Sequence, residues 1–259
     1  MNKRLIVSIA LGVLVAAGLL AVMGADLFWY HHTSNIVSGD DHTQYLLLAG
    51  RSGGQVVVGG DTADTLRVSG IAGANYSEFE ADGTLLFTGD AIVWEDLRAP
   101  ATVINPPGVE ADPDWDATNI GWLFDAGGIE ILYIIFQVPH SYKEGSDLYP
   151  HVHWQPTSTN GGNVLWRIDY KWTNMDATDA GSTTPVELLA PGDGTVLKHQ
   201  LDSFAVLDGT GKTISSILTI KLSRMGNDED DTYTGDALLK EFDIHYQVDT
   251  VGSRAELVK

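Results

Sequence analysis

The stretch LYPHVHWQP, residues 148–156, places two histidines one residue apart in a segment with the composition of a β-strand. Alternate residues of a strand point to the same face of its sheet, so His151 and His153 project together, away from Val152 and Trp154. Two imidazoles on one face can bind a metal ion, take part in catalysis or form part of an ordinary polar surface. The motif is short and common, so its role depends on which residues the neighbouring strands place beside it.

Two further segments, 164–173 and 238–249, also alternate between apolar and ionisable residues. Each would bury its apolar face, including Trp166, and expose the other. We predict that the ionisable faces of the three strands form one polar surface, whose members are His151, His153, Arg167, Asp169, Asp243 and His245. Of these, His245 is the residue that we predict as a metal ligand beside His151 and His153.

Three interpretations of this surface remain open. It is a solvated sheet face, a subunit interface in which charge pairs set the register, or a metal site. Around a three-fold axis, three copies of the His-x-His motif would supply six nitrogens. The motif also resembles the start of a cupin metal site, and a metal-dependent enzyme of that type would need a metal in each monomer and an open pocket beside His151 and His153. We predict no cofactor other than a metal ion at these histidines. The alternating Asp112, Asp114 and Asp116 could also bind calcium through their oxygens, although the segment is not an EF-hand.

Tryptophans suggest a second kind of site, because aromatic rings stack on the faces of sugars. Trp154, Trp166 and Trp172 occupy apolar strand faces, so we predict them in the core. Trp115 and Trp122 flank a long acidic segment instead. We therefore predict Trp115 and Trp122 as the ligand-binding residues of a carbohydrate contact.

The composition narrows the range of partners and activities. Asp and Glu number 35 against 15 Lys and Arg, a formal net charge of −20. Such a charge repels phosphate backbones, so we predict no nucleic-acid partner. The chain has no cysteine, which excludes disulfides and cysteine nucleophiles. None of its glycine-rich or acidic stretches has the spacing of a phosphate-binding loop or a catalytic triad, and we predict that the protein is not an enzyme.

Residues 1–30 differ from the rest of the chain. Lys3 and Arg4 precede an uncharged apolar run from Leu5 to Ala25. About 20 helical residues, at roughly 1.5 Å each, cover the hydrocarbon core of a bilayer. We predict an N-terminal apolar helix, either a transmembrane anchor or a signal peptide, with its basic end in the cytoplasm and the remainder of the chain exported.

The rest of the chain divides into two regions of different composition. Residues 31–77 have short apolar pieces between Gly-Gly and Asp-Thr turns, which predicts a glycine-rich β stalk that becomes stable when identical chains wrap together. Residues 78–259 predict an all-β domain, an antiparallel β-sandwich of jelly-roll type, with residues 105–119 as a long loop. Its expected strands are 84–87, 91–96, 129–137, 149–155, 164–173, 185–189, 214–224 and 238–249.

Several strings resemble bacteriophage and prophage structural proteins. DDHTQYLLLAGRSGGQ (residues 40–55) is similar to a linker of phage tail fibres. FTGDAIVWEDLRAPATVINPPG (87–108), VPHSYKEGSDLYPHVHWQP (138–156) and LLKEFDIHYQVDTVGSR (238–254) resemble a C-terminal domain of phage structural proteins. The resemblance implies a homotrimer in a virion appendage that ends in a receptor-binding or capping domain. The apolar N-terminus departs from that pattern, since phage tail proteins usually lack one.

These observations lead to one main functional prediction and one alternative. The main prediction is a non-enzymatic virion or virus-derived surface protein, located on a virion or at the cell surface. Its partners would be other copies of itself, other virion or filament proteins, a glycan or protein receptor, and a membrane reached through the N-terminal segment. The alternative is a host carbohydrate-binding β-sandwich module, membrane-anchored or secreted.

Overall fold

The computed structural model describes residues 66–69, 75–80, 83–106, 108, 111–179 and 181–259. The predicted apolar helix, the anchor or signal in residues 1–30 and most of the predicted stalk (31–77) lie outside the described residues. None of the helices in the described ranges has the length and apolar character needed to cross a membrane. The described helical residues form two 3-10 turns, η1 (Gly89–Ala91) and η2 (Ala101–Val103), and all other regular structure is antiparallel strand. The all-β prediction is confirmed.

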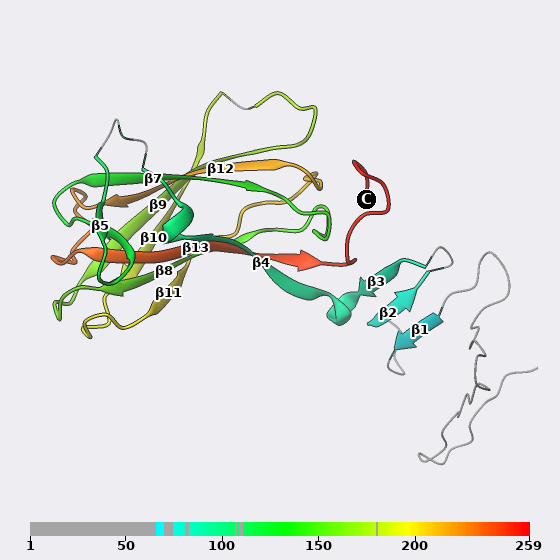
Figure 1. Cartoon of the computed structure of the whole chain (residues 1–259), viewed down its shortest axis with the longest axis horizontal. Helices are drawn as coiled ribbons and strands as arrows, with labels where there is room; N and C mark the ends of the chain where they lie inside the picture. The colour runs from blue at the N-terminus through cyan, green and yellow to red at the C-terminus, as the bar shows by residue number, and fades with distance from the viewer. Residues whose placement is uncertain (1–65, 70–74, 81–82, 107, 109–110, 180) are drawn as a thin grey trace, which may run out of the picture. The chain divides into compact units, whose positions relative to one another are not determined.

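Three short strands form a small sheet of their own. They are β1 (Leu66–Ser69), β2 (Tyr76–Phe79) and β3 (Leu85–Thr88), paired in that order. The remaining strands build a larger two-sheet domain (Figure 1). Their bounds are β4 (Val93–Pro100), β5 (Asp114–Asp116), β6 (Gly121–Phe124), β7 (Ile129–Gln137), β8 (Tyr149–Pro156), β9 (Asn163–Thr173), β10 (Thr184–Pro191), β11 (Gln200–Ser203), β12 (Ile217–Met225) and β13 (Ala237–Val248).

The strand order of the larger domain is that of a jelly roll. One sheet runs β4-β13-β8-β11 and the other runs β7-β12-β9-β10, so chain neighbours such as β7 and β8 lie in opposite sheets. This order is the one that two interleaved Greek keys produce. The short hairpin of β5 and β6 joins the first sheet, because β6 pairs with the start of β13 while β4 pairs with the rest of β13.

The core lies between the two sheets, and strand alternation fills it. Trp154 of β8 and Trp166 of β9 are fully buried, with ring centroids 6.4 Å apart across the sandwich. The indole Nε1 of Trp154 donates to Asp202 Oδ2 at 2.7 Å, which satisfies its only donor inside the apolar layer. Trp172 is buried as well, so the three tryptophans predicted in the core are all found there.

The predicted single polar surface is wrong in part. Arg167 and Asp169 do project from the outer face of β9, but β9 belongs to the second sheet, whereas β8 and β13 belong to the first. Periodicity reports which face a residue takes within its own strand and carries no information about which sheet that strand joins. His151, Asp243 and His245 therefore lie on one side of the sandwich, and Arg167 with Asp169 on the other.

A buried ion pair fixes the loop between β12 and β13. Arg224 ends the inner face of β12, and its side chain and that of Asp231 are both inaccessible to solvent. All five N–H groups of the guanidinium have an acceptor, which is the full capacity of an arginine. The acceptors are Asp231 Oδ1 (2.8 Å), Asp231 Oδ2 (3.0 Å), and the carbonyl oxygens of Phe124 (2.9 Å), Gly235 (2.8 Å) and Tyr233 (2.5 Å).

Candidate functional site

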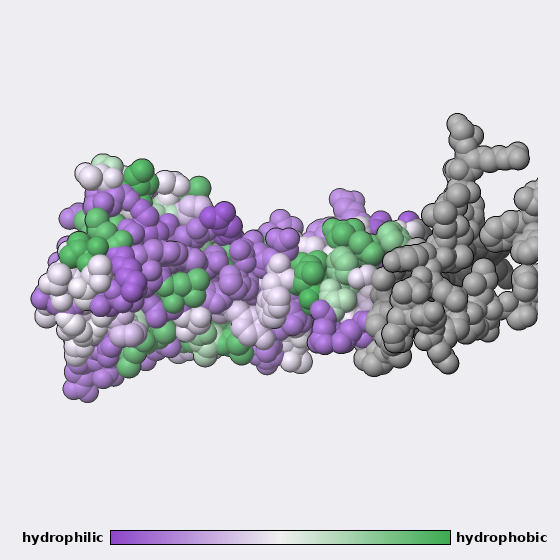
Figure 2. All heavy atoms as spheres, turned by 90° about the horizontal axis from the view of Figure 1, so that it is seen from below, coloured by the Kyte–Doolittle hydropathy of each residue, from purple (hydrophilic) through white to green (hydrophobic). Residues whose placement is uncertain are grey.

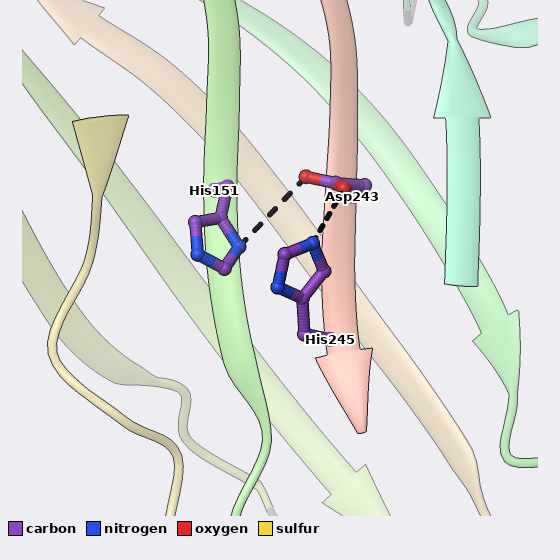
Figure 3. Close-up of side chains that lie close together, drawn as sticks. All are labelled: His151, Asp243 and His245. Carbon is purple, nitrogen blue, oxygen red and sulfur yellow. Dashed lines mark ion pairs between the residues drawn. The ribbon is translucent and has the colours of Figure 1, made fainter. Parts of the chain in front are cut away.

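The candidate site lies on the outer face of the first sheet, between β8 and β13. In their antiparallel register Asp243 stands directly opposite His151, and the next outward residue of β13, His245, is opposite Tyr149. Because residues two apart share a face, the His-x-His motif and the Asp-x-His sequence of β13 meet across one strand gap. Figure 3 shows His151, Asp243 and His245 pointing toward one another from these two strands.

Three imidazoles surround the carboxylate of Asp243. His153 Nε2 lies 3.3 Å from Asp243 Oδ1, and His245 Nε2 lies 3.4 Å from Oδ2. His151 Nδ1 is 3.9 Å from Oδ1, and the rings of His151 and His245 have centroids 4.2 Å apart. The site thus concentrates nitrogen and oxygen lone pairs around one anionic group.

Several polar atoms of this cluster are buried and unsatisfied. His151 is 7% exposed and Asp243 is 4% exposed. Within the described part of the chain no group forms a hydrogen bond with His151 Nδ1, His153 Nε2 or Asp243 Oδ1, since the close approach of the last two is poorly aligned. A buried polar atom without a partner typically costs about 1–3 kcal/mol. Three of them at one point therefore call for a ligand or a functional explanation.

The electrostatics separate the roles of the residues. Burial, followed by the neighbouring charge of His245, lowers the pKa of His151, which keeps this ring neutral at pH 7. The carboxylate of Asp243 raises the pKa of His153. Burial alone would raise the pKa of Asp243, but the imidazoles of His153, His151 and His245 outweigh it and the pKa is lowered. Asp243 is consequently an anion facing a neutral imidazole.

A second layer of side chains surrounds the cluster. His153 Nδ1 is 2.8 Å from His199 Nε2, and the two rings stack. On the β4 side, Asp96 Oδ1 is 3.1 Å from His245 Nε2. His153 and His245 thereby each have a further polar neighbour that restricts the orientation of the ring.

A hollow of about 330 Å³ opens beside the cluster. Its walls are Trp94, Tyr149, His151 and His245. The Trp94 ring is 50% exposed and stands at 83° to the Tyr149 ring, with centroids 5.1 Å apart. An exposed indole held edge-on by a tyrosine next to two imidazoles combines an apolar surface with hydrogen-bonding groups, which is the usual composition of a small-molecule site.

The three histidines predicted from the sequence are thus brought together, and the two predicted tryptophans form a separate pair. Trp115 of β5 and Trp122 of β6 face each other across that hairpin, with centroids 4.9 Å apart at 68°. Trp115 is 41% exposed, while Trp122 is half-buried and donates from Nε1 to the carbonyl of Ala101 at 2.9 Å. Trp115 is the more exposed of the two, and a sugar contact there stays a prediction.

Sequence reasoning placed Asp243 on the correct face but did not identify it as the centre of the site. It also did not single out Trp94, Asp96 or His199. Trp94 and Asp96 alternate on β4 in step with His245, because the register pairs Asp96 with His245. Once β4 is known to neighbour β13, that alternation is the signal that finds them.

A larger hollow, of about 490 Å³, lies on the outer face of the second sheet, lined by Tyr133, Arg167, Lys171 and their neighbours. Its charged groups already satisfy one another. Arg167 Nη2 is 2.8 Å from Asp169 Oδ1, and Lys171 Nζ is 3.2 Å from Asp179 Oδ2. Since a ligand would have to replace these pairs, the smaller hollow with its unsatisfied atoms is the stronger candidate.

The chain matches no protein-family model and no curated protein sequence. Among solved structures it is similar to a carbohydrate-binding module (CBM36-1) of a multidomain xylanase from the hindgut metagenome of Trinervitermes trinervoides, with 13% identity, 58% of this chain and 96% of that chain covered, and a TM-score of 0.34. It is also similar to the CBM35 of Cellvibrio japonicus Abf62, with 9% identity, 64% and 99% coverage and a TM-score of 0.37. A family 35 carbohydrate-binding module from Clostridium thermocellum follows, with 6% identity, 58% and 97% coverage and a TM-score of 0.34. With TM-scores this far below 0.5, the likeness bears on neither fold nor ligand, and both are argued from the chain itself.

Proposed function

We propose that the jelly-roll domain is a non-catalytic recognition module that binds a carbohydrate in the hollow between β4, β8 and β13. The observation behind the proposal is the half-exposed Trp94 ring, braced by Tyr149 at the rim of a hollow whose other walls are His151 and His245. This is the alternative function that the sequence suggested, at a different pair of aromatic residues.

The chemistry of the hollow suits a sugar. The apolar C–H face of a pyranose can lie on the indole. The ring nitrogens of histidine can accept a hydrogen bond from a hydroxyl group or donate one to it, and carboxylates accept hydrogen bonds from hydroxyl groups. Asp96, 3.1 Å from His245, adds an exposed acceptor at the same rim. On the face of the domain that Figure 2 shows, apolar atoms form small groups separated by hydrophilic ones. That face offers a polar ligand many contacts and an extended apolar partner few.

The experiment is a binding screen of the full chain against a panel of neutral and acidic glycans, followed by titration of any hit. Trp94→Ala is expected to weaken binding at least about 30-fold, because an aromatic anchor typically contributes about 2 kcal/mol or more. Trp115→Ala is the matched control, since it removes another exposed tryptophan from the same domain. It is expected to leave the affinity unchanged.

Two outcomes contradict the proposal. If no glycan binds the folded chain, the carbohydrate assignment is wrong. If Trp115→Ala abolishes binding while Trp94→Ala does not, the ligand lies on the β5–β6 hairpin, as the sequence predicted. The resemblance to phage structural proteins stays a separate prediction about where such a module is displayed, and its test is the presence of the protein in purified particles.

A further inference from the structure

We infer that His151, Asp243 and His245 form a binding site for a divalent transition-metal ion. Two imidazole rings and a carboxylate converge from adjacent strands, with ligand atoms that all lie within 4.8 Å of one another. The inference concerns this cluster alone and holds whatever occupies the neighbouring hollow.

The spacing is close to that of a formed site. Ligand atoms held at about 2.0–2.2 Å from a tetrahedral ion lie about 3.3–3.6 Å apart. His245 Nε2 and Asp243 Oδ2 are already 3.4 Å apart, and His151 Nδ1 is 3.9 Å from Asp243 Oδ1. Small side-chain rotations would close the set, without any movement of β8 or β13, which are fixed by their ladder.

The unsatisfied atoms are the independent observation. His151 Nδ1 and Asp243 Oδ1 are buried, and neither has a hydrogen-bond partner among the residues that the structure describes. A cation accepts the lone pairs of both. The same ion would offset the burial of the Asp243 carboxylate, which otherwise leaves a nearly inaccessible anion among imidazoles.

The donors select the kind of metal. Neutral imidazole with a single carboxylate suits Zn²⁺, Ni²⁺, Co²⁺ or Fe²⁺, whereas Ca²⁺ requires six or more oxygen ligands. Asp96, whose Oδ1 lies 3.1 Å from His245 Nε2, is placed to supply a further oxygen from the solvent side. His153 has a different part, because its Nε2 contacts Asp243 from outside the cluster and its Nδ1 meets His199. Its charge contact with the carboxylate, at 3.3 Å, places it beside the proposed ligands and not among them.

Without an ion, the cluster has a simpler explanation. The His245 ring would lie between the carboxylates of Asp96 and Asp243 and serve only as their polar partner. The two explanations differ in stoichiometric metal binding, so that property is the test.

The experiment titrates chelator-treated full-length protein with Zn²⁺ in a calorimeter and repeats the titration with Co²⁺ while recording the visible spectrum. The expected result is one ion per chain and a cobalt spectrum of a low-coordinate nitrogen–oxygen site. His245→Ala and Asp243→Asn are each expected to weaken binding by about 100-fold or more, since even outer partners of a metal site contribute about 10–100-fold.

The control is His140→Gln, because the His140 ring nitrogens contact Ser253 and Ser215 instead of the cluster. It should bind Zn²⁺ as the unmodified chain does. Circular dichroism identifies any variant that has not folded, and His245→Ala, which truncates a half-exposed ring, is the variant most able to fold. The inference is wrong if the folded parent chain binds neither Zn²⁺ nor Co²⁺. It is also wrong if folded His245→Ala binds these ions as tightly as the parent chain. Metal binding without glycan binding would retain this site and reject the proposed function.

Discussion

The Arg224–Asp231 pair gives a sharp test of how the jelly roll is held together. Asp231→Asn keeps the size of the side chain and removes its charge. In the unmodified chain, Asp231 accepts hydrogen bonds from Arg224 through both carboxylate oxygens and from the backbone N–H of Leu165 at 3.0 Å. An amide has only one oxygen, so its NH₂ group must face an N–H donor, and the guanidinium loses its counter-charge in a site without solvent.

The expected loss follows from the burial of the pair. Removing one partner of a buried ion pair typically costs about 3–5 kcal/mol, because the remaining charge stays buried. For a domain of about 150–250 residues, each kcal/mol lowers the melting temperature by about 2–4 °C. Asp231→Asn should therefore lower the melting temperature by about 6–20 °C, measured by calorimetry or by far-ultraviolet circular dichroism.

The neighbouring residue provides the control. Asp230 is exposed in the same loop, and Asp230→Asn should change stability by no more than about 0.5 kcal/mol. An Asp231→Asn protein that melts within about 2 °C of Asp230→Asn would refute the reasoning. Replacing both members by apolar residues should not restore stability, because the carbonyls of Phe124, Tyr233 and Gly235 would lose their donor.

Three further predictions concern pH, packing and metal. Burial raises the pKa of the Asp202 carboxyl in the folded state, so the protein loses stability as the pH rises from the unfolded pKa through the folded one. Asp202→Asn should therefore be more stable than the parent at pH 7. In unfolding measurements at decreasing pH, this difference should vanish below the unfolded pKa. Gly209→Ala should destabilise by about 1–3 kcal/mol or more, because the added carbon would lie 1.7 Å from the Ser146 carbonyl oxygen, whereas Gly161→Ala, with open space around it, should be nearly neutral in urea unfolding. Zn²⁺ at 100 times its dissociation constant should add about 2.7 kcal/mol, or about 5–11 °C in a thermal melt, and a chelator should reverse the gain; His245→Ala should show neither effect.

Alternation made much of the fold predictable. The expected bounds of the long strands β7, β9 and β13 lie within one residue of the observed ones, because each strand has a wide apolar face opposite a polar one. Three short strands of the larger domain, β5, β6 and β11, were not expected, whereas the short strand β3 was expected one residue from its observed place. β5 lies inside the segment predicted as a loop, and β6 and β11 have only four residues each, too few for a period-two pattern to stand out.

The sequence predicted which residues of the site share the outer face of their own strand. It could not predict which strands bring those residues together. The faces of His151 and His245 follow from counting along one strand, and so does the face of Asp243. Their meeting depends on β8 and β13 being adjacent although about 90 residues separate them in the sequence, and no local pattern encodes that pairing. The same limit explains the misplaced Arg167 and the missed Trp94, whose surroundings depend on which strands lie next to β9 and β4.

The position of β13 has a consequence for how the chain is made. This strand is translated after β4, β6 and β8, yet it lies between β4 and β8 and also pairs with β6. Until it emerges, the nascent chain holds the facing edges of β4 and β8 open, and His151 stands without Asp243. A chain that stops before Ala237 would keep those edges exposed and prone to pair with other copies. Closure of the first sheet therefore waits for β13, which is made long after the strands on either side of it.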